Sequence, residues 1–170
     1  MSSGNMSARE YPARPLVGVG VAVLRPDAVL LIRRGREPAL GQWSLPGGAQ
    51  RLGETVEDCA RRELLEETGL AVGALQLVAH VDSIHRDDGG RIQFHYTILD
   101  FAARWQGGEP RAQGDVTDAR FVPFAALGEL GLWSEAVRVV EAARHLLGSG
   151  LLSSGLLSSD GGVTALGDPS

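Results

Sequence analysis

The chain contains 170 residues, of which 16 are basic and 21 are acidic, so its formal net charge at pH 7 is −5. Every basic residue is Arg, so positive charge around a bound phosphate must come from a guanidinium or a metal ion. The length predicts one domain with a sizeable core, and the acidic balance argues against nonspecific binding to long nucleic acid, which needs a basic face.

The first predicted strand follows a short polar segment. Residues 1–14 are polar and small, and we expect a flexible N-terminal segment there. In residues 16–23, valine at every second position alternates with Gly18, Gly20 and Ala22, which is the period of a β-strand. The face formed by the small residues allows another element or a ligand to approach closely.

A second strand, a loop and a helix are predicted next. Residues 28–33 predict a strand, and residues 35–48 predict a loop because Gly and Pro are frequent there. Residues 55–68 predict a helix that begins near Thr55. Gly69 is the expected C-cap of this helix, where a left-handed residue is needed.

The second half of the chain predicts three strands and a helix. Residues 75–83 and 92–101 predict a hairpin around the turn-forming residues 87–90. Residues 119–122 predict a short strand, and residues 134–147 predict an amphipathic helix. A mixed β-sheet sandwiched between helices, in the α/β/α manner, accommodates all of these elements.

The last segment, residues 148–170, differs in composition from the rest. It repeats GLLSS, contains no basic residue and is dominated by Gly, Ser and Leu, which is typical of a flexible tail. Packing of its leucines on a partner is the alternative. The predicted organisation is therefore an N-terminal segment over residues 1–14, a domain over residues 15–147 and a tail over residues 148–170.

Cys59 is the one cysteine of the chain, so no internal disulfide can form. The N-terminal residues lack the apolar core of a signal peptide, and no apolar run reaches the ~18 residues that cross a bilayer. We therefore expect a cytoplasmic protein without a membrane partner.

Three carboxylates share one side of the helix predicted at residues 55–68. Glu66 and Glu67 follow Glu63 by three and four residues, so the three side chains fall within an arc of about 100°. Like charges at this spacing destabilise a helix, and Arg62 alone does not balance them. A divalent cation is the expected compensation, and ligands that are all oxygen favour Mg²⁺, or Mn²⁺, over zinc.

A magnesium site of this kind implies a phosphorylated substrate. Mg²⁺ keeps several waters and is usually shared between one or two carboxylates and substrate phosphates. It would neutralise a diphosphate and activate an attacking water. The alternative, an acidic helix face that is merely solvated, explains neither the spacing of the glycines nor Arg62.

The same residues belong to a longer motif. Residues 48–70 read GAQRLGETVEDCARRELLEETGL and match G-x5-E-x7-R-E-U-x-E-E-x-G-U at every position, where U is aliphatic. On average residue usage such a match arises by accident on the order of 10⁻¹⁰ times per start position. The chain therefore resembles the Nudix hydrolases over roughly residues 16–147. The resemblance implies the Nudix fold, which belongs to the α/β class.

The resemblance also implies a role for each residue of the motif. The residues expected to hold the metal are Glu63, Glu66, Glu67 and a main-chain carbonyl of Gly47 or Gly48. Glu63 is also a candidate for the base that activates water. Glu54 and Arg62 are expected to form a supporting pair that orients the carboxylates.

Four residues outside the motif are candidates for substrate binding: Arg33, Arg34, Trp43 and Asp115. One of the two arginines, which end the second strand, can clamp a phosphate bidentately. Trp43, in the lead-in QWSLPGG that is common in the family, either supports the catalytic loop or stacks on a base. Asp115 lies in the loop before the last strand, where it either contacts metal or water or serves as a turn residue.

Residues 95–101, followed by Glu109-Pro110 and residues 118–122, resemble the branch that acts on ADP-ribose and related ADP-sugars. Tyr96 or Phe94 is then a candidate to face the base. The expected reaction is Mg²⁺-dependent hydrolysis of the diphosphate linkage to AMP and a sugar phosphate.

The motif leaves two alternatives open, a nucleoside triphosphate pyrophosphohydrolase that removes damaged nucleotides and a module that senses a nucleotide without cleaving it. A sensor of this kind should have lost a carboxylate or Arg62, and all are present. The expected partner is a small nucleotide, and the family resemblance also implies a homodimer.

Overall fold

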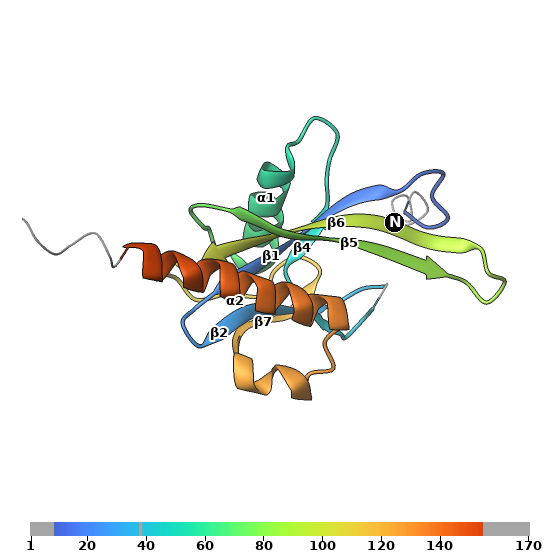
Figure 1. The fold of residues 1–170 in the computed structure, drawn as a ribbon. Helices are drawn as coiled ribbons and strands as arrows, with labels where there is room; N and C mark the ends of the chain where they lie inside the picture. Colours follow the sequence, from blue (N-terminus) through green and yellow to red (C-terminus); the bar gives the residue numbers. More distant parts are fainter. Residues whose placement is uncertain (1–8, 38, 155–170) are drawn as a thin grey trace, which may run out of the picture.

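The structure is a computed structural model that describes residues 9–37 and 39–154, and in this part of the chain seven strands form one mixed sheet between two α-helices (Figure 1). The strand order is β3-β2-β1-β6-β5, with β4 paired to β1 and β7 paired to β2. The predicted α/β architecture is confirmed. The elements in chain order are β1 (Leu16–Leu24), β2 (Ala28–Arg34), β3 (Trp43–Ser44), β4 (Gly47–Ala49), α1 (Val56–Thr68), β5 (Gln76–Arg86), β6 (Ile92–Arg104), β7 (Val116–Pro123), the 3₁₀ helix η1 (Phe124–Glu129) and α2 (Ser134–Ser154).

Strand β1 is the centre of the sheet. It runs parallel to β6 over nine registered pairs, from Leu16 opposite Tyr96 to Leu24 opposite Arg104. On its other side it runs antiparallel to the short strand β4. The loop that precedes α1 is thereby attached to the middle of the sheet, with β4, β1 and β6 side by side (Figure 1).

The side chains of β1 alternate between two buried layers. Val21 and Val23 pack in the core layer that contains α1 residues. Ala22 packs in the other layer, which contains α2 residues. Gly18 and Gly20 lie on the α2 side but have no side chains, so a cleft opens between this part of the sheet and the start of α2. The sequence prediction that this face of β1 admits a close approach is consistent with the cleft.

The structure differs from the sequence prediction at three elements. The segment predicted as loop contains β3 and β4, which have two and three residues and are too short to show a periodic pattern. The 3₁₀ helix η1 was not predicted. Helix α2 continues past the predicted end at Leu147 to Ser154, because adding residues to an existing helix is easier than starting one. The rest of the predicted tail, residues 155–170, lies outside the described residues.

The hairpin of β5 and β6 extends beyond the helices and contacts the N-terminal segment (Figure 1). Of the segment predicted to be flexible, residues 1–14, residues 1–8 lie outside the described residues. Within the described part, the Tyr11 main-chain N–H donates to the Gln93 carbonyl at 2.8 Å. The Tyr11 hydroxyl donates to Asp87 at 2.9 Å. The end of this segment is therefore attached to the hairpin.

No helix in the described ranges is long and apolar enough to cross a membrane.

Helix α1 has the ends that its sequence predicts. The Thr55 side chain accepts a hydrogen bond from the Asp58 main-chain N–H at 3.1 Å and so caps the first turn. Gly69 has a φ of 70°, and its N–H donates to the Leu65 carbonyl at 2.9 Å. Both ends of the helix that carries the acidic residues are thereby defined by local interactions.

Replacing Gly69 by Ala should lower the free energy of unfolding by about 1–2 kcal/mol, because a Cβ atom disfavours the left-handed conformation. Gly128→Ala is the matched control, since its φ is not positive and a Cβ there would meet nothing within 4 Å. Urea denaturation of both variants measures the difference. Equal losses at the two positions would contradict the role assigned to Gly69.

Candidate active site

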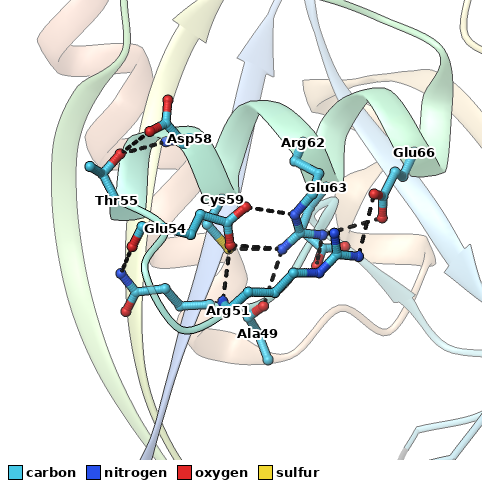
Figure 2. A network of polar contacts seen from close by, with 10 residues as sticks. Ala49, Arg51, Glu54, Thr55, Asp58, Cys59, Arg62, Glu63 and Glu66 are labelled. Carbon is cyan, nitrogen blue, oxygen red and sulfur yellow. Dashed lines mark hydrogen bonds and ion pairs between the residues drawn. The ribbon is translucent and has the colours of Figure 1, made fainter.

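Arg62 connects the loop before α1 to the acidic side of the helix (Figure 2). Its Nε and Nη2 atoms donate to the two carboxylate oxygens of Glu54 at 2.7 and 3.0 Å. Its Nη1 atom donates to Glu63 at 2.7 Å. The hydrogen bonds from Arg62 lower the pKa of Glu54 to about 2, and those with Glu54 and Glu63 raise the pKa of Arg62. Arg62 therefore pairs with Glu54 and also binds Glu63, and the expected role of this pair in orienting metal ligands stays a prediction.

Glu63 lies between Arg62 and the main chain of β4. A Cβ atom at Gly48 would collide with the Glu63 carboxylate, so only glycine allows this approach. The Glu63 side chain is 15% exposed, which leaves its carboxylate little freedom to move. Glu63 and the main chain of Gly48 are thus adjacent, as expected for two ligands of one metal ion.

Glu67 is held by the other glycine of the loop. The Gly47 main-chain N–H donates to the Glu67 carboxylate at 2.9 Å. Burial raises the pKa of Glu67 to about 7, and the negative charge of Glu63 acts in the same direction. A cation beside these two carboxylates would therefore relieve an unfavourable concentration of buried negative charge.

Glu66 is the most exposed of the three acidic residues. It accepts a hydrogen bond from Arg62 at 3.2 Å and lies 3.5 Å from Arg51 (Figure 2). Within the described residues, no group of three or more His, Cys, Asp or Glu side chains is arranged to hold a metal ion. Glu63 and Glu66 are turned toward Arg62, whereas Glu67 is turned toward Gly47. The donor set, carboxylates next to main-chain carbonyls, nevertheless fits Mg²⁺ or Mn²⁺ in chemical type.

A cleft of about 660 Å³ extends from Glu67 along the α2 face of the sheet. Its lining includes Gly47, Gly48 and Glu67 and also residues in the first turns of α2. Its size is within the range of small-molecule sites, about 300–1,000 Å³. The cleft can therefore accept a ligand that extends from the acidic residues toward α2.

Three of the four predicted substrate residues line this cleft: Arg34, Trp43 and Asp115. Arg34 is close enough to Glu67 for their charges to interact. The Trp43 ring also lies under the Arg120 guanidinium, 4.6 Å from the ring centroid, so it both supports the protein and faces the cleft. Asp115 forms an ion pair with Arg36 at 2.5 Å.

Arg33 is placed differently from Arg34. It is not one of the described residues that line the cleft, and its Nε donates to the Gly41 carbonyl at 2.9 Å. Successive side chains of a strand point to opposite faces, so one of the two adjacent arginines faces away. Phe94 and Tyr96, the candidates to face a base, both line the cleft.

Asp100 is a cleft residue that the sequence analysis did not identify. It lies in the middle of β6 opposite Gly20 and is 5% exposed. A Cβ atom at Gly20 would collide with the Asp100 carboxylate. Burial raises the pKa of Asp100 to about 6. In the sequence, the sign of this residue is one acidic side chain within the apolar run of residues 98–103. Its place in the cleft follows only from the register of β6 with β1, which sets Asp100 opposite Gly20.

Comparison with known proteins identifies the family. Residues 14–143 match the family model described as NUDIX domain. The chain is 35% identical over 123 residues to the ADP-ribose pyrophosphatase of Methanocaldococcus jannaschii. The aligned region covers 72% of this chain and 70% of the relative. It is 36% identical over 134 residues to the putative 8-oxo-dGTP diphosphatase 2 of Mycobacterium tuberculosis. This aligned region covers 77% of this chain and 90% of the relative.

A solved structure agrees with these matches. The MutT NUDIX hydrolase from Burkholderia pseudomallei is 31% identical, with a TM-score of 0.67 over 76% of this chain and 98% of that one. The chain therefore belongs to the NUDIX family, and the predicted resemblance is confirmed. It is a Nudix pyrophosphohydrolase whose relatives are named for two different kinds of substrate.

Asp100→Asn should stabilise the protein at high pH and not at low pH. The pKa of Asp100 is about 6 in the folded protein and 3.8 in an ordinary carboxyl. Below pH 3.8 the Asp100 carboxyl is protonated in both the folded and the unfolded protein. Above pH 6 or so the folded protein contains a buried negative charge, which opposes folding. The gain in unfolding free energy should therefore be about 2–3 kcal/mol larger at pH 8 than near pH 4.

Urea denaturation at the two pH values measures this difference. Asp82→Asn is the control, because Asp82 is an exposed carboxylate on the adjacent strand β5. A gain from Asp100→Asn that is the same at both pH values would contradict the assignment of a buried, partly protonated carboxyl.

Proposed function

We propose that this protein is a Mg²⁺-dependent pyrophosphohydrolase that cleaves ADP-ribose or an ADP-sugar to AMP and a sugar phosphate. The observation that carries the proposal is that one cleft is lined by Glu67 and the glycines of β4 and also by residues of α2. A diphosphate beside Glu67 would leave the nucleoside directed into the rest of the cleft. The similarity to the Methanocaldococcus jannaschii ADP-ribose pyrophosphatase supports this choice of substrate.

Glu63, Glu66, Glu67 and a main-chain carbonyl of Gly47 or Gly48 would hold Mg²⁺. When bound, this ion would neutralise the diphosphate and lower the pKa of an attacking water. The residues of the chain would supply the positioning.

The Arg62 guanidinium holds the Glu63 carboxylate next to Gly48, and the Gly47 main-chain N–H holds the Glu67 carboxylate. Such contacts matter because groups that orient the ligands of a metal typically affect affinity or activity by about 10–100-fold. Arg34 lines the cleft near Glu67 and is the guanidinium placed to bind a phosphate oxygen. Glu63 is proposed as the base that takes the proton of the attacking water.

Hydrolysis of a damaged nucleoside triphosphate is the second candidate. It is supported by the similarity to the putative 8-oxo-dGTP diphosphatase 2, which extends over 90% of that relative. Both reactions would use the same carboxylates, so the residues farther along the cleft determine which nucleotide is accepted. A nucleotide sensor without activity is less well supported, because every residue of the motif is present.

We also propose that the protein forms a homodimer. Val17 and Ile84 are 39% and 48% exposed near the projecting hairpin, which provides apolar surface for a second copy. Light scattering coupled to size-exclusion chromatography measures the molar mass in solution.

The substrate is tested by incubating the protein with Mg²⁺ and ADP-ribose, an ADP-sugar, 8-oxo-dGTP or dGTP, and by identifying the products. Production of AMP and ribose 5-phosphate at the highest kcat/KM supports the first candidate. Preferential release of pyrophosphate from a triphosphate supports the second. Tight binding of ADP-ribose without any product would indicate the sensor.

Glu67→Gln should reduce kcat by about a hundredfold or more, because the substitution removes a charged metal ligand while keeping its shape. Glu57→Gln is the matched control, since Glu57 is an exposed residue in the first turn of the same helix. Steady-state kinetics at saturating Mg²⁺, with circular dichroism to verify folding, measures the effect. A near-normal rate in the Glu67 variant would contradict the assigned role.

A further inference from the structure

Asp100 is a buried carboxylate for which the described part of the chain provides no hydrogen-bond donor. It is 5% exposed, and no hydrogen bond or ion pair reaches its carboxylate within residues 9–37 and 39–148, whose side chains the structure describes. The positive charge of Arg138 lowers the pKa of Asp100, but Arg138 forms its own ion pair with Glu135 at 2.6 Å. A largely buried carboxylate without a donor from the described residues is unfavourable, so this acceptor is left to water or to a ligand in the cleft.

The position of Asp100 in the cleft shows where a ligand would meet it. Asp100 lines the cleft together with Leu45, Trp133, Ala136 and Val139. A cleft that combines apolar and aromatic side chains with this acceptor suits a flat heterocycle that carries N–H donors. A metal ion is a poorer match, because a lone carboxylate beside apolar side chains and an arginine offers too few oxygen ligands.

The sheet sets the separation between this acceptor and the acidic residues. Asp100 is opposite Gly20 in the parallel pairing of β6 with β1, and Gly20 is opposite Gly47 in the pairing of β1 with β4. Adjacent strands are about 4.8 Å apart, so the main chains of Asp100 and Gly47 are separated by about 10 Å across the sheet. The Asp100 carboxylate lies over Gly20, so a ligand that extends from Gly47 across β1 would meet it. Gly47 is the residue that binds Glu67.

We propose that Asp100 is the specificity-determining residue for the substrate base, and that its carboxylate accepts hydrogen bonds from the N–H edge of a purine at the α2 end of the cleft. The inference rests on the proposed function, because it takes the diphosphate to lie beside Glu67. Gly20 is part of the same arrangement, since any side chain there would displace the Asp100 carboxylate. A site built to accept a hydrogen bond discriminates against an analogue without the donor, because its own polar group is then left unpaired.

The test compares nucleotides that differ only in the base. Adenine, guanine and hypoxanthine carry N–H donors, whereas unsubstituted purine carries none once it is joined to ribose. For the wild-type protein, kcat/KM for the preferred base should exceed that for unsubstituted purine by about 10–100-fold, mainly through KM. Asp100→Ala should reduce this ratio to about threefold or less. Asp100→Asn, which keeps one neutral acceptor, should retain an intermediate ratio.

Asp82→Asn is the control, because Asp82 faces away from the cleft and accepts a hydrogen bond from Thr97 at 3.0 Å. Calorimetric binding of the corresponding nucleoside monophosphates gives a second readout that does not require turnover. An unchanged ratio in Asp100→Ala, by kinetics and by binding, would overturn the inference even if the enzyme hydrolyses the substrates. Base-dependent binding that is lost in Asp100→Ala without any hydrolysis would support the inference and contradict the proposed activity.

Discussion

The ion pairs of Arg62 are the interaction on which the candidate site depends. One guanidinium binds both oxygens of Glu54 in the loop and also binds Glu63 on α1. The Arg62 side chain is 16% exposed, so water screens these contacts less than it would at the surface. Three carboxylates on one side of a helix repel one another, and Arg62 offsets part of this repulsion by binding Glu63 and Glu66. A lysine would not serve equally, because its point charge cannot bind Glu54 bidentately while donating to a second carboxylate.

The position of that helix relative to the substrate is determined by the sheet. Strand β4 attaches the glycine loop to β1, and the carboxylates of Glu63 and Glu67 contact this loop at Gly48 and Gly47. On the other face, Gly18 and Gly20 remove side chains from β1 and open the cleft toward α2. One strand thus supports the glycine loop and provides the floor of the cleft.

Two acids, the half-buried Glu67 and the buried Asp100, are unfavourable for folding in their charged forms. Burial raises the pKa of both Glu67 and Asp100, which means that the folded protein disfavours their charged forms. Both line one cleft and are not scattered through the core. Perturbed carboxyl groups that line the same cleft are typical of functional sites, where interactions with a ligand offset the cost that the folded protein bears.

The sequence by itself determined the family, the helix with its caps and the acidic residues that share its face. These features are local, because the period of a helix and the conformation of a C-cap such as Gly69 follow from residues a few positions apart. The tertiary structure decided which side chains meet in the cleft, including Arg34 rather than Arg33 and, above all, Asp100. Asp100 faces Gly20 only because β6 pairs with β1 in one particular parallel register, and no periodicity within either strand specifies that register.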